Sequence, residues 1–138
     1  YCQIGYPVLD KNGYTDPSTE NRWMISPNFM FASRVSSSTD KVDFWAAVSR
    51  CKNYSETGTD GVTYTGWRMP TYAEMLLLDI LQNVSKSEIK EITDRHRYWT
   101  ADPASNSAFR ILNPSGGTNG ENASYAEVRC VRDIDRPL

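Results

Sequence analysis

The stretch Gly66-Trp67-Arg68-Met69-Pro70-Thr71-Tyr72-Ala73-Glu74 carries a helix-start signal in the middle of the chain. Thr71 and Glu74 have capping-box spacing, in which the hydroxyl and the carboxylate each accept a hydrogen bond from the other residue's backbone amide. Pro70 favours a sharp entry into the helix. We expect Arg68 to pair with Glu74 here; the alternative is that Arg68 binds a ligand. The residues that follow predict a deeply buried helix: Met75, Leu77, Leu78, Ile80 and Leu81.

Upstream, Phe44, Ala47, Val48 and Cys51 recur at i, i+3, i+4 and i+7, which predicts an amphipathic helix with Cys51 on its buried face. The preceding residues 36–40, rich in serine, are expected to form a loop that also caps this helix. Residues 53–65 are mostly polar and contain two glycines, so we expect a loop there.

The last third of the chain is predicted to be β-rich. Its expected strands are 98–101, 108–112 and 125–132, the last alternating so that Ala126, Val128 and Cys130 share a face. Long polar loops are expected at 102–107 and 113–124, and a second capping box at Ser85 predicts a shorter helix. Two main helices among strands and long loops predict an α+β fold.

The N-terminal residues 1–22 contain turn signals with little periodicity, and are either a linker or a first strand. Asn12-Gly13 is expected to close a short hairpin. Pro27 interrupts the apolar run 23–32, which predicts two short strands or one bent segment. The abrupt start at Tyr1-Cys2 favours a domain from a longer protein over a mature product.

Composition bounds the class of protein. A chain of 138 residues fits one domain, 1–138, and a 39% hydrophobic share supports a real core. A formal net charge of −2, without a lysine or arginine block, gives no footprint for nucleic acid. No apolar run reaches membrane-spanning length.

Three cysteines leave the redox state open. One bridge and one leftover thiol suit a secreted chain, whereas three reduced, buried thiols suit a cytosolic one.

Four motifs in order resemble a known bacterial domain family. They are Trp45-Ala46 with Cys51, the 66–71 stretch with Glu74, Tyr98-Trp99-Thr100-Ala101, and Val128-Arg129-Cys130-Val131-Arg132-Asp133. The set resembles the C-terminal domain of Legionella collagen-like adhesin and of Fibrobacter major paralogous proteins. With Ile25-Ser26-Pro27-Asn28-Phe29-Met30 ahead of the first helix, it is most similar to the C-terminal domain of Bacteroidales surface proteins, fimbrial tip subunits included.

This resemblance, over about residues 23–133, implies a C-type-lectin-like fold with a small twisted antiparallel sheet. It also implies a disulfide between Cys51 and Cys130 and a secreted or cell-surface location, on bacteria such as gut commensals. The implied function is non-catalytic adhesion to a glycan or matrix protein. The alternative is a structural fimbrial tip or stalk domain whose partners are other fimbrial subunits.

An enzyme is the third hypothesis, because formylglycine-generating enzymes have a similar fold. Those enzymes use a reactive cysteine pair that this chain does not match. A Cys2–His96 pair is the remaining nucleophile and base, with a surface histidine as the alternative.

No cofactor is expected, and the sequence offers no zinc-ligand spacing. Calcium is not excluded, although Glu56 and Asp60 are sparse ligands and Asn113-Pro114-Ser115 departs from the sugar-binding lectin motif.

Candidate binding residues lie in the long loops. Amide side chains donate and accept hydrogen bonds, which suits hydroxyl or peptide groups; the candidates are Asn106, Asn113, Asn119 and Asn122. Trp67, Tyr98 and Trp99 are expected to pack in the core, with sugar stacking as the alternative.

Overall fold

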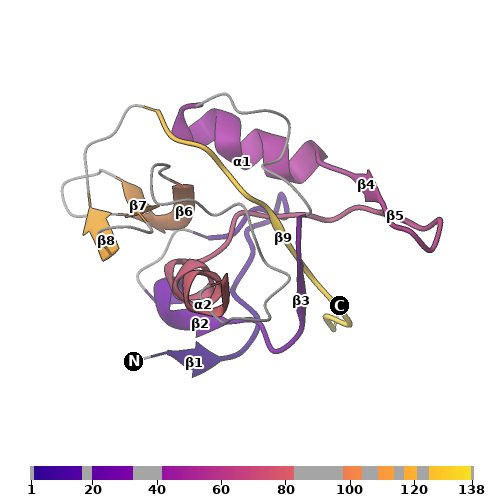
Figure 1. Cartoon of the computed structure of the whole chain (residues 1–138), viewed down its shortest axis with the longest axis horizontal. Helices are drawn as coiled ribbons and strands as arrows, with labels where there is room; N and C mark the ends of the chain where they lie inside the picture. The colour runs from indigo at the N-terminus through magenta and orange to yellow at the C-terminus, as the bar shows by residue number, and fades with distance from the viewer. Residues whose placement is uncertain are drawn as a thin grey trace.

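A computed structural model describes residues 2–16, 20–32, 42–82, 98–103, 109–113, 117–120 and 125–137. Its elements in chain order are β1 Gln3–Ile4, the 3-10 helix η1 Asn21–Trp23, β2 Met24–Ile25, β3 Phe29–Phe31, α1 Phe44–Asn53, β4 Glu56–Thr57, β5 Thr63–Tyr64, α2 Tyr72–Gln82, β6 Tyr98–Pro103, β7 Phe109–Asn113, β8 Gly117–Gly120 and β9 Val131–Asp133. The described part therefore has the predicted α+β class, with α1 and α2 on either side of the C-terminal segment (Figure 1).

The strands form small sheets. β1 and β2 pair in parallel, whereas β3 pairs with β9, β4 with β5, and β7 with both β6 and β8 in antiparallel fashion. β1 shows that residues 1–22 contribute a strand. The Asn12-Gly13 hairpin is confirmed, since Leu9 and Thr15 bridge and Gly13 has φ +82°. The 23–32 run forms two strands on either side of Pro27, as one of its alternatives predicted.

The C-terminal segment is the central element of the fold. Residues 126–131 are all buried. Their backbone pairs successively with four parts of the chain: Ala126 with Val42, Glu127 with β6, Cys130 with Ala32, and Val131 with Arg68. The predicted alternation from Tyr125 to Arg132 is therefore wrong: both sides of this segment are covered, and the strand begins only at Val131. Cys130 is the residue directly before β9.

Helix α1 confirms the predicted apolar face, since Phe44, Ala47, Val48 and Cys51 are buried. Its cap is Asp43, whose carboxylate accepts a hydrogen bond from the Ala46 amide at 2.7 Å. The predicted caps at 36–40 lie outside the described residues.

Helix α2 confirms the capping box. The Thr71 amide donates to Glu74 Oε1 at 2.9 Å, and the Glu74 amide donates to Thr71 Oγ1 at 3.1 Å. Met75 and Leu78 are buried, but Ile80 and Leu81 are 63% and 37% exposed. The prediction of a deeply buried helix thus holds only for the face with Met75 and Leu78. Near its C-terminal end, the opposite face of α2 is exposed to solvent.

Two predicted loops contain strands. Residues 53–65 form the β4–β5 hairpin, in which Gly61 adopts φ +80° and the Thr57 and Thr63 hydroxyls are 2.9 Å apart. β8 lies within the predicted 113–124 loop. The predicted helix from Ser85 lies outside the described residues.

The core joins α1 to the C-terminal segment. Cys51 and Cys130 form a disulfide with their Cα atoms 5.5 Å apart, as the resemblance implied. Around it pack buried side chains from both ends of the fold: Ala32, Val42, Phe44, Ala47, Val48, Trp67, Met69, Trp99, Ala101, Ala126 and Val128. A second cluster lies under α2 and contains Met75, Leu78, Tyr98 and Val131.

Candidate functional site

A buried ion-pair network joins α2 to β9. Arg68 Nη1 donates to Glu74 Oε1 at 2.8 Å, and Arg68 Nη2 donates to Asp133 Oδ1 at 2.8 Å. The Glu74 carboxylate also accepts hydrogen bonds from the backbone amides of Ser26 and Thr71, each at 2.9 Å. The predicted Arg68–Glu74 pair is therefore confirmed.

The network favours the charged forms of Asp133 and Arg68. Burial acts to raise the pKa of Asp133, but hydrogen bonds and the positive charge of Arg68 outweigh it, so the pKa lies below its ordinary value. Burial likewise opposes the charge of Arg68, but Glu74 and Asp133 raise its pKa, so it stays protonated. The Arg68 side chain is 2% exposed. This network is structural, because a ligand has no access to its guanidinium.

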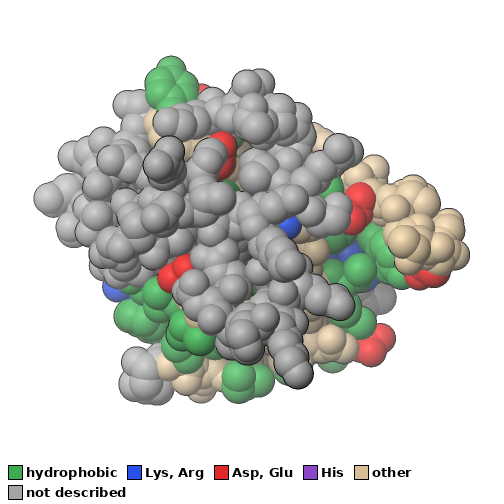
Figure 2. Space-filling view, in the orientation of Figure 1, with side chains coloured by type: hydrophobic (Ala, Val, Ile, Leu, Met, Phe, Trp, Pro, Cys, Tyr) green, Lys and Arg blue, Asp and Glu red, His purple; other side chains and the backbone are tan. Residues whose placement is uncertain are grey.

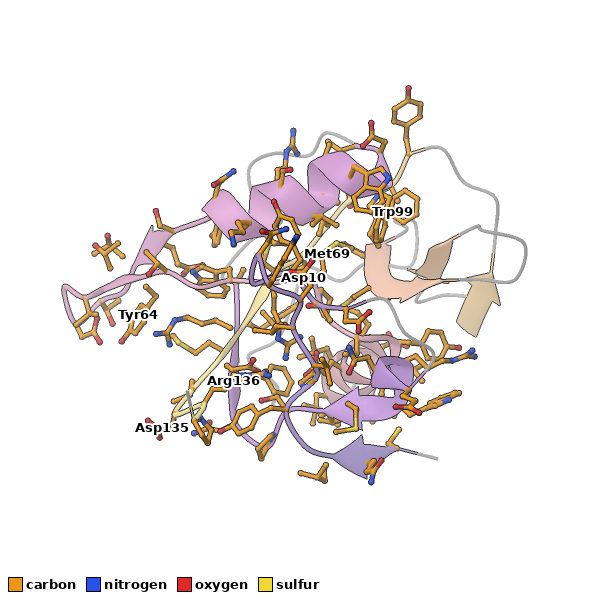
Figure 3. All side chains as sticks on the ribbon, turned by 180° about the vertical axis from the view of Figure 1, so that it is seen from behind. Asp10, Tyr64, Met69, Trp99, Asp135 and Arg136 are labelled. Atoms are coloured by element: carbon orange, nitrogen blue, oxygen red, sulfur yellow. A yellow bond between two sulfur atoms is a disulfide. The ribbon has the colours of Figure 1, made fainter. Side chains whose placement is uncertain are left out.

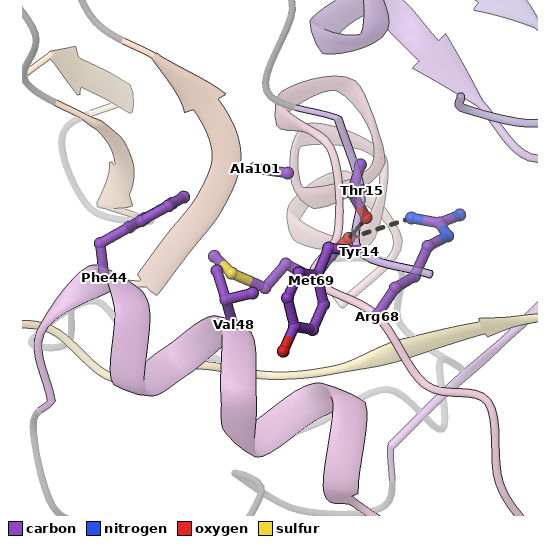
Figure 4. A pocket seen from close by; sticks show the side chains of 7 residues that line it. All are labelled: Tyr14, Thr15, Phe44, Val48, Arg68, Met69 and Ala101. Carbon is purple, nitrogen blue, oxygen red and sulfur yellow. Dashed lines mark hydrogen bonds between the residues drawn. The ribbon is translucent and has the colours of Figure 1, made fainter. Parts of the chain in front are cut away.

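The enclosed cavity beside this network is too small for a ligand. It lies between Thr15, Val48, Met69 and neighbouring side chains (Figure 4) and holds about 10 Å³. Thr15 Oγ1 and Arg68 Nη1 both donate to the Met69 carbonyl, each at 3.0 Å. A volume of this size accommodates about one water molecule.

The three aromatic side chains considered for sugar stacking are core residues. Trp67 and Trp99 are 2% exposed and Tyr98 is 1% exposed. Trp99 lies beside the start of α1 (Figure 3) and donates its Nε1 hydrogen to the Val42 carbonyl at 2.7 Å. The predicted packing role is confirmed, and stacking on an external sugar by these rings is excluded by their burial.

The candidate asparagines are only partly placed. Asn113 ends β7 and pairs with Gly117, while Asn119 in β8 pairs with Ile111, so their backbones share one sheet. Asn106 and Asn122 lie outside the described residues. The binding role of all four asparagines stays a prediction.

Two of the three cysteines and both candidate carboxylates are engaged in contacts within the fold. Cys51 and Cys130 are bonded to each other, Cys2 is a free and exposed thiol, and His96 lies outside the described residues. Glu56 accepts a hydrogen bond from the Tyr54 hydroxyl at 2.8 Å. Hydrogen bonds from Tyr64 and Val62 lower the pKa of Asp60. Within the described ranges, no three His, Cys, Asp or Glu side chains gather as metal ligands do.

Helix α1 presents an exposed aromatic residue, Trp45, to which the sequence analysis gave no binding role. Trp45 is 66% exposed, and Tyr125 on the C-terminal segment is 61% exposed. The signal for Trp45 was its place off the buried stripe of α1, one residue beyond Phe44. Toward the other end of this helix, a shallow hollow of about 450 Å³ is lined by Ser49, Arg50, Asn53, Tyr54 and Ser55.

A second surface feature is apolar. Hydrophobic side chains gather over β1 and β2 in the lower part of Figure 2. An open groove of about 620 Å³ lies there, and its described lining is Ile4, Ile25, Ser26, Pro27, Asn28, Phe29, Phe31, Leu77, Leu78 and Leu81. Across the described segments, neither helix has the length and apolar character needed to cross a membrane.

Comparison with known proteins gives a distant relationship. No protein-family model matches the chain. Two curated relatives from Porphyromonas gingivalis, both named major fimbrium tip subunit FimD, are 28% identical to it over 152 residues. The match covers 94% of this chain but 22% of each relative, so the chain spans about a fifth of their length.

Proposed function

We propose that the chain is a non-catalytic adhesion domain of a fimbria-associated protein at the bacterial cell surface. The observation that carries the proposal is the relationship to fimbrium tip subunits, which extends over 94% of the chain. The Cys51–Cys130 disulfide supports it, because such bonds persist in the oxidising conditions of secreted and surface proteins. The ligand is a glycan or a matrix protein, and the candidate binding residues are Asn113 and Asn119 of the β7–β8 pair together with Asn106 and Asn122.

A direct test is saturable capture of ligand. The purified chain, immobilised through its N-terminus, is exposed to mucin glycans, plant polysaccharides, fibronectin and collagen, with and without a chelator. We expect saturable binding to one of these without chemical change in the ligand. Loss of binding in the chelator would assign a role to calcium. Absence of binding to every ligand would count against adhesion.

We propose further that the fold is C-type-lectin-like and that the domain belongs to a longer surface protein. The α+β class and the disulfide between the first helix and the C-terminal segment support the fold, and the match to about a fifth of a tip subunit's length supports the longer protein. A crystal structure superposed on a C-type lectin domain tests it: α1, α2 and the C-terminal strand should align in the same order. A different connection of these elements would reject the fold.

The apolar groove favours a second candidate function, contact with another fimbrial subunit. Leu81, 37% exposed, is one of its lining residues. If the groove is a subunit interface, Leu81→Ser should abolish co-purification with fimbrial subunits and leave ligand capture unchanged. Retained co-purification would argue against this candidate.

A further inference from the structure

Trp45 is the most exposed of the four tryptophans. It is 66% exposed, whereas Trp67 and Trp99 are 2% exposed and Trp23 is partly buried. Its ring contacts Phe44 edge to face, with centroids 5.2 Å apart, and Phe44 is itself buried. The indole is therefore held by the core at one edge and presents most of its surface to solvent.

Tyr125 lies close to the same end of α1. Val42 and Ala126 form an antiparallel bridge with N–O distances of 2.8 and 2.9 Å, and this register places Tyr125 opposite Asp43. Asp43 caps α1 two residues before Trp45. The Val42 carbonyl also accepts the Trp99 hydrogen bond from the core. Trp45 and Tyr125 therefore lie next to backbone that two contacts hold in place, the Val42–Ala126 bridge and the hydrogen bond from Trp99.

The hollow lined by Ser49 and Asn53 continues the same helix face. Trp45, Ser49 and Asn53 follow at i, i+4 and i+8, so they lie in a row along α1. Ser49 and Asn53 line the hollow, and the eight helical steps from Trp45 to Asn53 make the row about 12 Å in length. We call this row, with Tyr125 at its aromatic end, the α1 track.

We infer that the α1 track binds a carbohydrate chain. A sugar ring has an apolar C–H face that stacks on an aromatic ring, and a rim of hydroxyls that hydrogen-bond to amide, hydroxyl and guanidinium groups. The track offers both in series: Trp45 and Tyr125, then Ser49 and Asn53, with Arg50 beside them in the lining of the hollow. A protein partner fits less well, because a stable interface needs a contiguous apolar core and this row is polar beyond Trp45.

This inference rests on the proposed adhesion function, narrows its ligand to a glycan, and places the glycan on α1 in place of the four asparagines. The test uses the full chain on a panel of starch, xylan, pectin and mucin O-glycans, with binding measured by titration calorimetry. We expect Trp45→Ala to weaken binding about tenfold or more, which corresponds to about 1.4 kcal/mol. Asn53→Ala should weaken it several-fold. Ile80→Ala is the matched control: it removes a 63% exposed apolar side chain from α2, and affinity should stay within about twofold.

Fluorescence gives a second readout. Because Trp45 is the exposed indole, iodide should quench mainly its emission, and bound glycan should protect it. Trp45→Phe should remove this protection and retain part of the affinity. Each variant is checked for an unchanged far-ultraviolet circular dichroism spectrum.

The outcomes separate the two proposals. Glycan binding that survives Trp45→Ala unchanged would overturn the α1 track and leave adhesion standing. Binding to fibronectin or collagen without any glycan would do the same. No binding to any glycan or matrix protein would overturn both.

Discussion

At the scale of single residues, Glu74 has the most demanding environment. It is 0% exposed, and its carboxylate accepts hydrogen bonds from both terminal nitrogens of Arg68 and from the amides of Ser26 and Thr71. Glu74→Gln removes the charge but leaves Arg68 buried. We expect a loss of about 3 kcal/mol in the free energy of unfolding, at the low end for a broken buried pair because Asp133 still faces Arg68. Urea unfolding followed by tryptophan fluorescence measures it.

Glu20→Gln is the control for this substitution. Glu20 is exposed and its side chain makes no capping hydrogen bond to η1, so the change should cost less than about 0.5 kcal/mol. Equal, small losses in the two variants would contradict the structural role of the network.

Asp133 makes stability depend on pH. Its folded pKa is lowered: burial acts to raise it, but Arg68 outweighs burial and Arg136 assists at 3.0 Å. A carboxylate with a lowered pKa stabilises the fold above its unfolded pKa, near 3.8, and the contribution fades as pH falls through the folded value. The difference in urea midpoint between the unmodified chain and Asp133→Asn should therefore be constant at neutral pH and shrink below about pH 4. A difference that persists undiminished in strong acid would refute this.

At the scale of elements, the disulfide ties α1 to the C-terminal segment. Its cysteines are separated by 79 residues, so the chain-entropy model gives a stabilisation of about 4.5 kcal/mol. Replacing both Cys51 and Cys130 with alanine should lower the free energy of unfolding by up to this amount, whereas Cys2→Ser should leave it unchanged, because Cys2 is exposed.

Thiol titration of the denatured, unreduced chain checks the same bond. One free thiol per chain is expected, from Cys2. Three thiols would show that the disulfide does not form.

The helices were predictable because their signals are local. The capping box at Thr71 and the periodic apolar face of α1 lie within single elements, and both are present in the structure. The β4–β5 hairpin was missed because its strands are two residues long and polar, and contacts such as Tyr64 to Asp60 at 2.5 Å stabilise it. No apolar alternation marks such a hairpin.

The C-terminal segment shows the limit of pattern analysis more clearly. Glu127 and Arg129 are 2% and 3% exposed, although alternation placed them toward solvent. Segments distant in sequence cover them; Arg129, for instance, donates to the Ala32 carbonyl at 2.9 Å. The α1 periodicity places Trp45 off the buried stripe, but it cannot show the Val42–Ala126 bridge that brings Tyr125 to the same end of the helix. The candidate site could therefore not be found from the α1 periodicity alone.

At the scale of the whole molecule, residues 2–16, the N-terminal segment, pack against the rest of the fold. The sequence alone left open whether this segment is a linker. The Tyr6 hydroxyl donates to the Ile134 carbonyl at 3.0 Å, and Arg136 lies 5.3 Å from the centre of the Tyr6 ring. Asn21 holds the segment from the other side: it accepts from the Val8 amide at 2.8 Å and donates to the Val8 and Asp16 carbonyls. The two ends of the chain therefore stabilise each other.

Asn21→Ala should consequently cost about 1–3 kcal/mol, because it leaves backbone groups of the N-terminal segment without their partner. Deleting residues 1–16 should cost more, since it also removes the Thr15 hydrogen bond to Met69 and one wall of the cavity beside it. Thermal unfolding measures both, with Gln3→Ala, an exposed position, as the control. If the N-terminal segment were a linker, the deletion would leave the melting temperature unchanged. A fall in that temperature for Asn21→Ala and a larger fall for the deletion would instead show that the N-terminal segment stabilises the rest of the fold.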